Sequence, residues 1–266
     1  MRYCINYFVA LHSLREILKL AIHKHGVWHL HQSGFDTCLH SLKIELLYSI
    51  SRLRHVEKRI CLLLAVQNDL GERISNIVLM GMGEPLDNYD NVKRAIDVLT
   101  ADWGFGWSPK RITLSSIGVL PTLKRYLDET RCHLAISMHD AFPDERGELM
   151  PVQKSYPLKD VVNLIRQYDF TGQRRVSFEY TMFSGHNDDK RHADAIIRLL
   201  SGLECRVNLI RFHKIPDFPY VSSSEGVMEV FRDRLNKAGI TSTIRASRGE
   251  DIFAACGMLA GKHKQQ

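Results

Sequence analysis

The stretch His133-Leu-Ala-Ile-Ser-Met-His139 decides the fold of this 266-residue chain. Its first half is a short apolar run, and polar side chains follow directly where such a strand would end. Runs of the same kind recur through the last two thirds of the chain, and most are followed by a polar or glycine-rich cluster. The six predicted strands are Asn76–Met80, Arg111–Ser115, His133–Ser137, Arg175–Tyr180, Arg206–Ile210 and Thr241–Arg245.

The spacing of these runs predicts a parallel sheet. They start roughly 22 to 42 residues apart, the scale of a strand–helix unit. Helix-period segments lie between them, for example at residues 91–100, 158–168, 192–200 and 225–238. Buried strands alternating with amphipathic helices are typical of α/β proteins. Polar clusters after at least four strands favour a partial parallel (β/α) barrel, because a doubly wound sheet gathers ligands only around its switch point.

Composition and charge set further limits. Hydrophobic residues make up 44% of the chain and charged residues 25%, which are ordinary globular values and exclude wholesale disorder. The longest apolar runs are far shorter than a membrane span, so we expect a cytoplasmic protein without a membrane partner. The net charge of +6 is compatible with a nucleic-acid partner but is weak support for one.

The first 70 residues differ from the rest. They carry 7 of the 13 histidines and only 2 of the 17 glycines. We therefore expect two regions, an atypical helical or irregular segment over residues 1–73 and the barrel over residues 74–266, with possible helices at residues 11–22 and 42–64. The four histidines between residues 23 and 31 lack accompanying carboxylates or cysteines, so loop or surface positions are favoured over a metal site.

Two local patterns bear on cofactors. The six cysteines lie at least 23 residues apart, so neither a disulfide framework nor a local cysteine motif for a metal or cluster is indicated, and no metal ligand is assigned. Gly81-Met-Gly-Glu-Pro85 follows a strand but is not a dinucleotide loop, because Leu86 stands where the last glycine would be. Its glycines permit close backbone approach to a ligand, and Glu84 could bind a cationic amine. A tight turn with a solvated glutamate is the alternative.

Five motifs in chain order resemble one family. They are Met80-Gly-Met-Gly-Glu-Pro-Leu86, Leu114-Ser-Ser-Ile-Gly118, Ala135-Ile-Ser-Met-His139, Val207-Asn-Leu-Ile210 and Arg248-Gly-Glu-Asp-Ile-Phe-Ala-Ala-Cys-Gly257. Together they resemble the RlmN/Cfr family of radical S-adenosylmethionine (SAM) enzymes, and the RlmN branch more than the Cfr branch. The resemblance runs from about residue 74 to about residue 260. It implies a radical SAM barrel that methylates adenine C2 of 23S rRNA and tRNA.

The resemblance also implies roles for individual residues. Gly83 and Glu84 correspond to the pair that engages the SAM amino group. Cys256 corresponds to the cysteine that accepts a methyl group from one SAM and passes it on by a radical mechanism. The other implied SAM contacts are Ser115, Ser137, Met138, His139 and Asn208. Taken singly, each has a structural alternative, such as a strand-end cap, a core histidine, a satisfied amide or a small buried thiol.

The family's cofactors and partners follow from the same resemblance. It implies SAM, a [4Fe–4S] cluster held by a CxxxCxxC motif, rRNA and tRNA substrates, and an electron donor such as flavodoxin. The chain has no CxxxCxxC, so the cluster ligands are not assigned and activity of this chain is in question. The alternative is a SAM- or RNA-binding remnant without catalysis. Candidate phosphate contacts are Lys110, Arg111, Arg174, Arg175, Lys190, Arg191, Lys262, His263 and Lys264.

Overall fold

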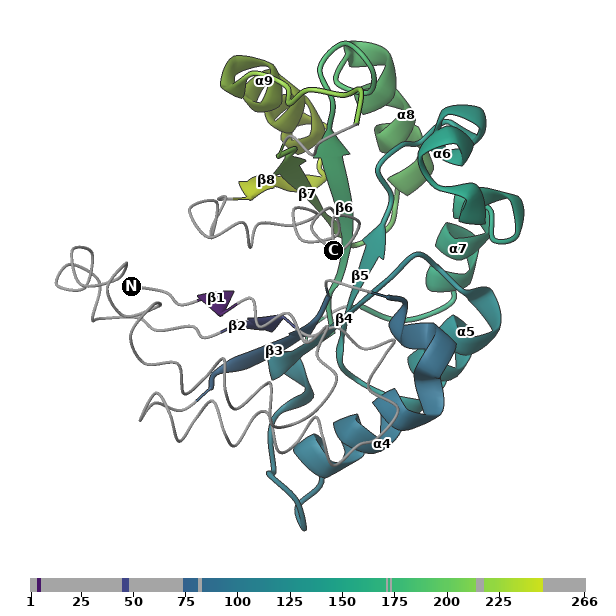
Figure 1. Ribbon diagram of the computed structural model, residues 1–266, viewed down its shortest axis with the longest axis vertical. Coiled ribbons are helices and arrows are strands. Elements are labelled where there is room, and N and C mark those ends of the chain that lie inside the picture. Colours follow the sequence, from purple (N-terminus) through teal and green to yellow (C-terminus); the bar gives the residue numbers. More distant parts are fainter. Residues whose placement is uncertain are drawn as a thin grey trace, which may run out of the picture. The chain divides into compact units, whose positions relative to one another are not determined.

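A computed structural model describes residues 4–5, 45–47, 74–80, 83–170, 172, 174–213 and 218–245 (Figure 1). The chain divides into two compact units, Met1–Thr113 and Leu114–Gln266. The predicted division between residues 73 and 74 stays a prediction. In the described part of the chain, no helix is long and apolar enough to cross a membrane.

The first unit contains three short parallel strands. Strand β1 (Cys4–Ile5) pairs with β2 (Glu45–Leu47), which pairs with β3 (Asn76–Leu79). The helix predicted over residues 42–64 is therefore wrong at Glu45–Leu47, and the helix predicted over residues 11–22 lies outside the described residues. After β3 come the 3₁₀ turn η2 (Pro85–Asn88), helix α4 (Tyr89–Thr100) and the 3₁₀ turn η3 (Pro109–Arg111).

The second unit alternates strands and helices. Its strands are β4 (Ile112–Ser116), which begins in the first unit, β5 (His133–Ser137), β6 (Val176–Met182), β7 (Arg206–Arg211) and β8 (Thr241–Arg245). Its helices are α5 (Leu120–Glu129), α6 (Pro143–Leu149), α7 (Leu158–Ile165), α8 (Lys190–Leu200) and α9 (Glu225–Lys237), with the 3₁₀ turn η4 (Pro151–Lys154) after α6. The pairs β5–β6, β6–β7 and β7–β8 are all parallel. The predicted α/β class is confirmed.

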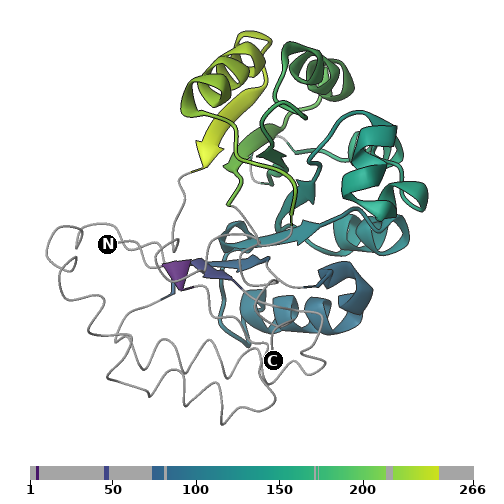
Figure 2. The ribbon, with the colours of Figure 1, turned by 45° about the horizontal axis from the view of Figure 1, so that its top comes forward.

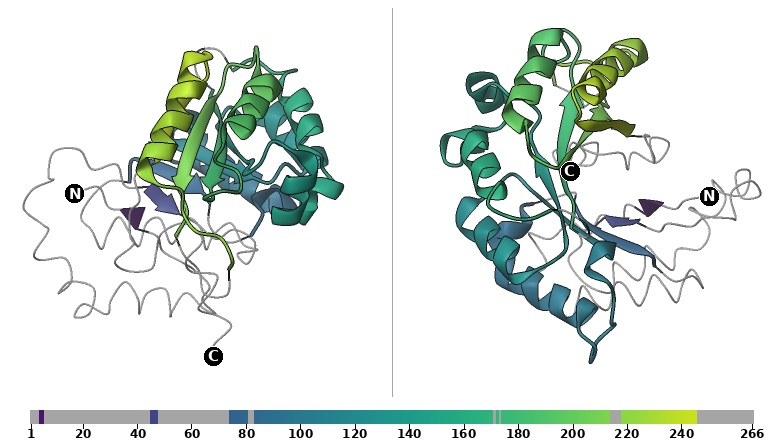
Figure 3. Two further views of the ribbon diagram at one scale, coloured as in Figure 1. Left: turned by 90° about the horizontal axis from the view of Figure 1, so that it is seen from above. Right: turned by 180° about the vertical axis from the view of Figure 1, so that it is seen from behind.

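The strands of the second unit present two different faces. In Figures 2 and 3 its helices lie on one face of its strands, and the described residues place no helix of this unit on the other face. The helix-facing side chains form the core; Tyr180 of β6, for example, stacks on Phe231 of α9 with ring centroids 5.6 Å apart. Since residues alternate along a strand, the remaining side chains point to the face without helices. This fold is a partial parallel (β/α) barrel.

Local chemistry explains where elements begin. Asp189 and Ser224 accept hydrogen bonds from the first turns of α8 and α9, which are ordinary helix-capping contacts. Strand β4 begins at Ile112 rather than Arg111 because Pro109 starts the short turn η3, which runs through Arg111. Helices α5 and α6 each carry a proline in their first turn, a position where its missing N–H is harmless.

Arg174 is buried, which makes its prediction as a phosphate contact wrong. Only 5% of its surface is exposed, and its guanidinium donates to the carbonyl oxygens of Cys132, Leu127 and Tyr126. Of the other predicted phosphate contacts, Lys110, Arg111, Arg175, Lys190 and Arg191 are exposed, and residues 262–264 lie outside the described residues.

Candidate functional site

A row of polar residues crosses four adjacent strands of the second unit at one level. Ser137 of β5 is in register with Glu179 of β6, Glu179 with Asn208 of β7, and Asn208 with Thr243 of β8. Register partners in a parallel sheet point to the same face. Their neighbours along the strands, such as Tyr180, point to the helices. The row therefore lies on the face of the barrel without helices.

Hydrogen bonds fix the side chains in the middle of this row. The Asn208 amide nitrogen donates to Glu179 Oε1 over 2.8 Å, and the Thr243 hydroxyl donates to the Asn208 amide oxygen over 3.0 Å. Ser177 also donates to Glu179 Oε1, over 2.9 Å. Asn208 is thus held in one orientation by partners on both neighbouring strands. Sequence reasoning located Asn208 only through resemblance; the structure supplies the contacts that position it.

Glu179 is the residue that sequence reasoning missed. It is 4% exposed, and its second carboxylate oxygen has no hydrogen bond among the described residues. Arg245 at the end of β8 lies 3.5 Å from that oxygen and supplies the nearest positive charge in the described structure. A buried carboxylate with an unused acceptor is unusual unless a ligand completes it. The signal was present in the sequence, since Glu179 interrupts an apolar strand.

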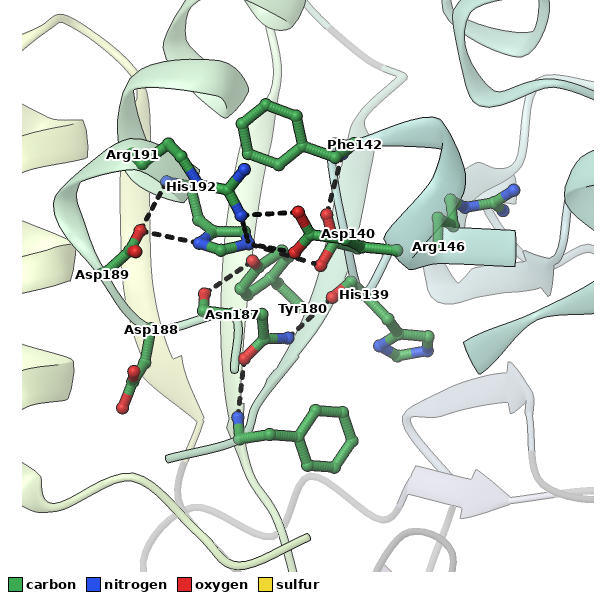
Figure 4. Close-up of polar contacts among 12 residues, drawn as sticks. His139, Asp140, Phe142, Arg146, Tyr180, Asn187, Asp188, Asp189, Arg191 and His192 are labelled. Atoms are coloured by element: carbon green, nitrogen blue, oxygen red, sulfur yellow. Dashed lines mark hydrogen bonds and ion pairs between the residues drawn. The ribbon is translucent and has the colours of Figure 1, made fainter. Parts of the chain in front are cut away.

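Ser137, Met138 and His139 form the carboxyl end of β5. His139, labelled in Figure 4, adopts φ +56°. Its Nδ1 accepts a hydrogen bond from the Thr181 backbone N–H over 3.1 Å. Burial, together with the positive charge of Arg146, lowers the pKa of His139 from 6.5 to about 4. The imidazole is therefore neutral near pH 7 and carries its proton on Nε2. Met138 is fully buried, so its side chain belongs to the core.

Arg146 of α6 holds this strand end in place. Its guanidinium donates to the carbonyl oxygens of Ser137, Met138 and Ile117 and to the Gln153 side chain, and the residue is fully buried. Burial lowers the pKa of Arg146 to about 10, which still leaves it charged at neutral pH. Because Ile117 follows β4 and Ser137 ends β5, Arg146 fixes the carboxyl ends of two strands together.

The remaining predicted site residues stand in different parts of the chain. Ser115 lies in β4 and is partly exposed. Gly83 adopts φ +85°, and the Glu84 carboxylate accepts a hydrogen bond from the Leu86 N–H over 3.0 Å, which caps η2. Gly83 and Glu84 belong to the first unit, so their convergence with Ser137 and Asn208 stays a prediction. Cys256 lies outside the described residues.

Comparison with known proteins identifies the class. Residues 62–196, half of the chain, match the family model of the radical SAM superfamily. The chain is 36% identical to a radical SAM methyltransferase from Sphaerobacter thermophilus of known crystal structure, with a TM-score of 0.70 over 76% of this chain and 60% of the other. The chain therefore belongs to the radical SAM superfamily, and the predicted barrel type is confirmed.

Curated relatives narrow the class. The chain is 59% identical over 192 residues to a probable dual-specificity RNA methyltransferase RlmN of Porphyromonas gingivalis, covering 72% of this chain and 56% of the relative. It is 58% identical over 189 residues to the corresponding protein of Parabacteroides distasonis, covering 71% and 55%. Within the radical SAM proteins it is thus related to the RlmN RNA methyltransferases, as its motifs predicted. The chain spans about half the length of these relatives.

Proposed function

We propose that this chain is an RlmN-type enzyme that binds SAM on the open face of its barrel and methylates adenine C2 of 23S rRNA and tRNA. The observation that carries the proposal is the row Ser137–Glu179–Asn208–Thr243, with its oriented amide and its buried acceptor. Hydroxyl, amide and carboxylate groups at this spacing suit the ribose hydroxyls and the charged amino-acid end of SAM. The family relationship supports the same ligand and an RNA substrate.

The proposal assigns SAM contacts residue by residue. Asn208, Ser137 and the neutral His139 would bind the nucleoside or carboxyl part of SAM, with Glu179 as a further acceptor beside Asn208. Glu84 would face the SAM amino group, because its carboxylate stands at a turn that Gly83 opens with positive φ. Ser115 and the backbone beside Met138 would complete the set. Cys256 would be the thiol that accepts a methyl group.

No iron–sulfur cluster site is assigned among the residues that the structure describes. No two cysteines of the chain lie closer than 23 residues. Of the cysteine side chains that the structure describes, Cys132 is buried before β5, and burial raises the pKa of Cys205 to about 12, so its thiol is protonated and a poor ligand. We therefore derive no reductive step. This observation favours a second candidate function, a module that binds SAM or RNA without catalysis.

The first experiment tests SAM binding. Titration calorimetry of the full chain with SAM should show one site, and Asn208→Ala should weaken the affinity at least about tenfold, because a positioned amide contact is lost. Asn163→Ala is the matched control, since Asn163 is exposed on α7. Equal affinities of the three proteins, or no SAM binding by the unmodified chain, would refute the proposed site.

The second experiment separates the two candidate functions. Anaerobic iron–sulfur reconstitution followed by UV–visible and EPR spectroscopy reports whether the chain holds a [4Fe–4S] cluster. With the cluster and a reduced electron donor such as flavodoxin, an rRNA fragment or tRNA should gain 2-methyladenine. SAM affinity without a cluster signal supports the binding module. If the exposed cations contact RNA, the logarithm of its affinity should fall with log salt by about 0.7 to 0.9 per phosphate contact.

A further inference from the structure

A second cluster of chemical groups lies outside the polar row, behind the carboxyl end of β5. Asp140 follows that strand, Glu145 belongs to α6, and His192 belongs to the first turn of α8 (Figure 4 labels Asp140 and His192). One ligand atom of each, two carboxylate oxygens and an imidazole nitrogen, lie within 4.8 Å of one another. Residues remote in sequence thus bring three electron-rich atoms together.

His192 is oriented as metal-binding histidines are. Its ring is 1% exposed, and Nδ1 lies 2.7 Å from Asp189 Oδ1, which also accepts from the His192 backbone N–H. In the tautomer with its proton on Nδ1, His192 donates that proton to Asp189, and the Nε2 lone pair faces the other two groups, as a metal ligand requires. Nε2 lies 2.9 Å from Glu145 Oε2 and 3.7 Å from Asp140 Oδ2. A carboxylate behind the imidazole fixes the tautomer in many metal centres.

Asp140 supplies an independent observation. It is fully buried, and its Oδ1 accepts from the Phe142 N–H over 2.8 Å. Its Oδ2, which points toward His192, has no hydrogen-bond partner among the described residues. A proton on His192 Nε2 would form a hydrogen bond with Glu145 Oε2 at 2.9 Å, and Asp140 Oδ2 would remain without a donor. A cation bound between the three atoms would coordinate all of them and neutralise the buried carboxylate of Asp140.

Arg191 is the competing cation in this cluster. Its guanidinium lies over the Phe142 ring and donates to Glu145 Oε1 over 2.5 Å, with the same nitrogen 3.4 Å from His192 Nε2. It therefore engages the other oxygen of Glu145, and the structure records no contact between it and Asp140 Oδ2. Apart from His192 Nε2 at 3.7 Å, the described residues give Asp140 Oδ2 no ion-pair partner.

We propose that Asp140, Glu145 and His192 bind one divalent transition-metal ion, for which Zn²⁺ is the best match. Imidazole and carboxylates are zinc ligands, and two carboxylates with a neutral imidazole balance the charge of the ion. Ligand atoms around tetrahedral zinc lie about 3.3 Å apart. The two pairs that include His192 Nε2 are 2.9 and 3.7 Å apart, and all three atoms lie within 4.8 Å of one another, so binding an ion requires the two carboxylates to adjust around it. Glu145 keeps 26% of its side chain exposed, so this side of the cluster borders solvent.

Such an ion would join three elements of the barrel. It would tie the loop after β5, helix α6 and the start of α8 together beside His139, without itself contacting the polar row. Its role would be structural, and the inference does not depend on the proposed function.

The test is metal binding by the full chain. Protein freed of metal with a chelator is titrated with Zn²⁺, and separately with Co²⁺, whose visible spectrum reports its ligands. We expect the unmodified chain to bind one metal ion, with a Co²⁺ spectrum typical of nitrogen and oxygen ligands. We expect Asp140→Asn and His192→Gln to lose this bound ion. Asp144→Asn is the matched control, because Asp144 is an exposed neighbour on α6 outside the cluster.

A third variant addresses the orientation of His192. Asp189→Asn keeps the helix cap but weakens the partner of Nδ1, and should weaken metal affinity by about 10- to 100-fold. Thermal unfolding without metal checks that every variant folds. The proposal is overturned if the unmodified chain binds no Zn²⁺ or Co²⁺, if the Co²⁺ spectrum shows thiolate ligands, or if the equivalent survives in both Asp140→Asn and His192→Gln.

Discussion

Each end of strand β5 is held by a buried arginine, but the two arginines position different segments of the chain. At the amino end, Arg174 donates to the carbonyl oxygens of Cys132, Leu127 and Tyr126 and lies over the Tyr126 and Phe170 rings. At the carboxyl end, Arg146 donates to the backbone that follows β4 and ends β5. Burial lowers the pKa of both guanidinium groups.

The difference lies in what each arginine positions. Arg174 ties the end of helix α5 to the start of β5, a region that contains none of the proposed SAM contacts. Arg146 fixes the backbone of Ser137 and Met138, which borders the polar row and His139. In (β/α) barrels the carboxyl ends of the strands carry function and the amino ends carry stability. We therefore expect the same chemistry, a buried guanidinium that donates to backbone carbonyl oxygens, to affect ligand binding at the carboxyl end only.

The largest effect is expected for Arg146→Met. The substitution preserves much of the side-chain volume but leaves buried carbonyl oxygens without donors, so the free energy of unfolding should fall by about 3–5 kcal/mol. SAM affinity should fall as well, because the end of β5 loses its support. Urea denaturation and titration calorimetry measure the two effects. An unchanged SAM affinity in the folded variant would contradict the role given to this end of the strand.

Arg174→Met should be somewhat milder. The substitution removes the hydrogen bonds to three carbonyl oxygens and the contacts with two rings. The free energy of unfolding should therefore fall by about 2–4 kcal/mol. The SAM affinity of the folded protein should stay within about twofold of the unmodified chain, a difference near the error of such measurements. A loss of affinity equal to that of Arg146→Met would break the comparison between the two ends.

Gly118→Ala tests the carboxyl end of β4. Gly118 has φ +97°, and an added Cβ would lie 2.6 Å from Val161 Cγ2 on α7. Strained backbone and overpacking together should lower the free energy of unfolding by about 1–3 kcal/mol. Gly147→Ala in α6 is the control, since an added Cβ there meets no atom within 4 Å. It should be neutral or stabilising in the same urea experiment.

The smallest effect concerns Cys205, which precedes β7 at its amino end. Burial raises the pKa of its thiol from 9.0 to about 12 in the folded chain. The unfolded chain therefore releases this proton first, and stability falls as pH rises above about 9. Between pH 8 and pH 10 the unmodified chain should lose at most about 1.4 kcal/mol more than Cys205→Ala. Parallel pH profiles of the two proteins would contradict this burial effect.

Sequence reasoning succeeded where the signal is local. The apolar runs placed β3 to β8 within one or two residues, since a buried strand needs a short β-branched stretch whatever it packs against. The helices α5 and α6 were not named from the sequence. Helix α6 is short, polar and begins with proline, but α5 buries Leu123, Tyr126 and Leu127 at helical spacing, so its signal was present in the sequence. Ser137 and Asn208 were found through motifs, and the structure places them on one row.

Sequence reasoning failed where a residue's role depends on distant partners. Arg174 has an arginine neighbour in the chain and suggested a surface charge, but carbonyl groups more than 40 residues away bury it. Arg146 was passed over for the same reason, whereas Glu179 was passed over although it stands inside an apolar strand. His192 gave no sign of its three carboxylate neighbours, two of which lie about 50 residues earlier.

The order of strands and helices, the parallel sheet and the family could be predicted from the sequence alone, because hydrophobic periodicity and short motifs act over a few residues. The structure was needed to show that Glu179 lies beside Asn208, that Arg146 and Arg174 are buried, and that Asp140, Glu145 and His192 face one another. Strand register and side-chain burial arise from packing between segments far apart in the chain, and no local pattern records which groups that packing will bring into contact.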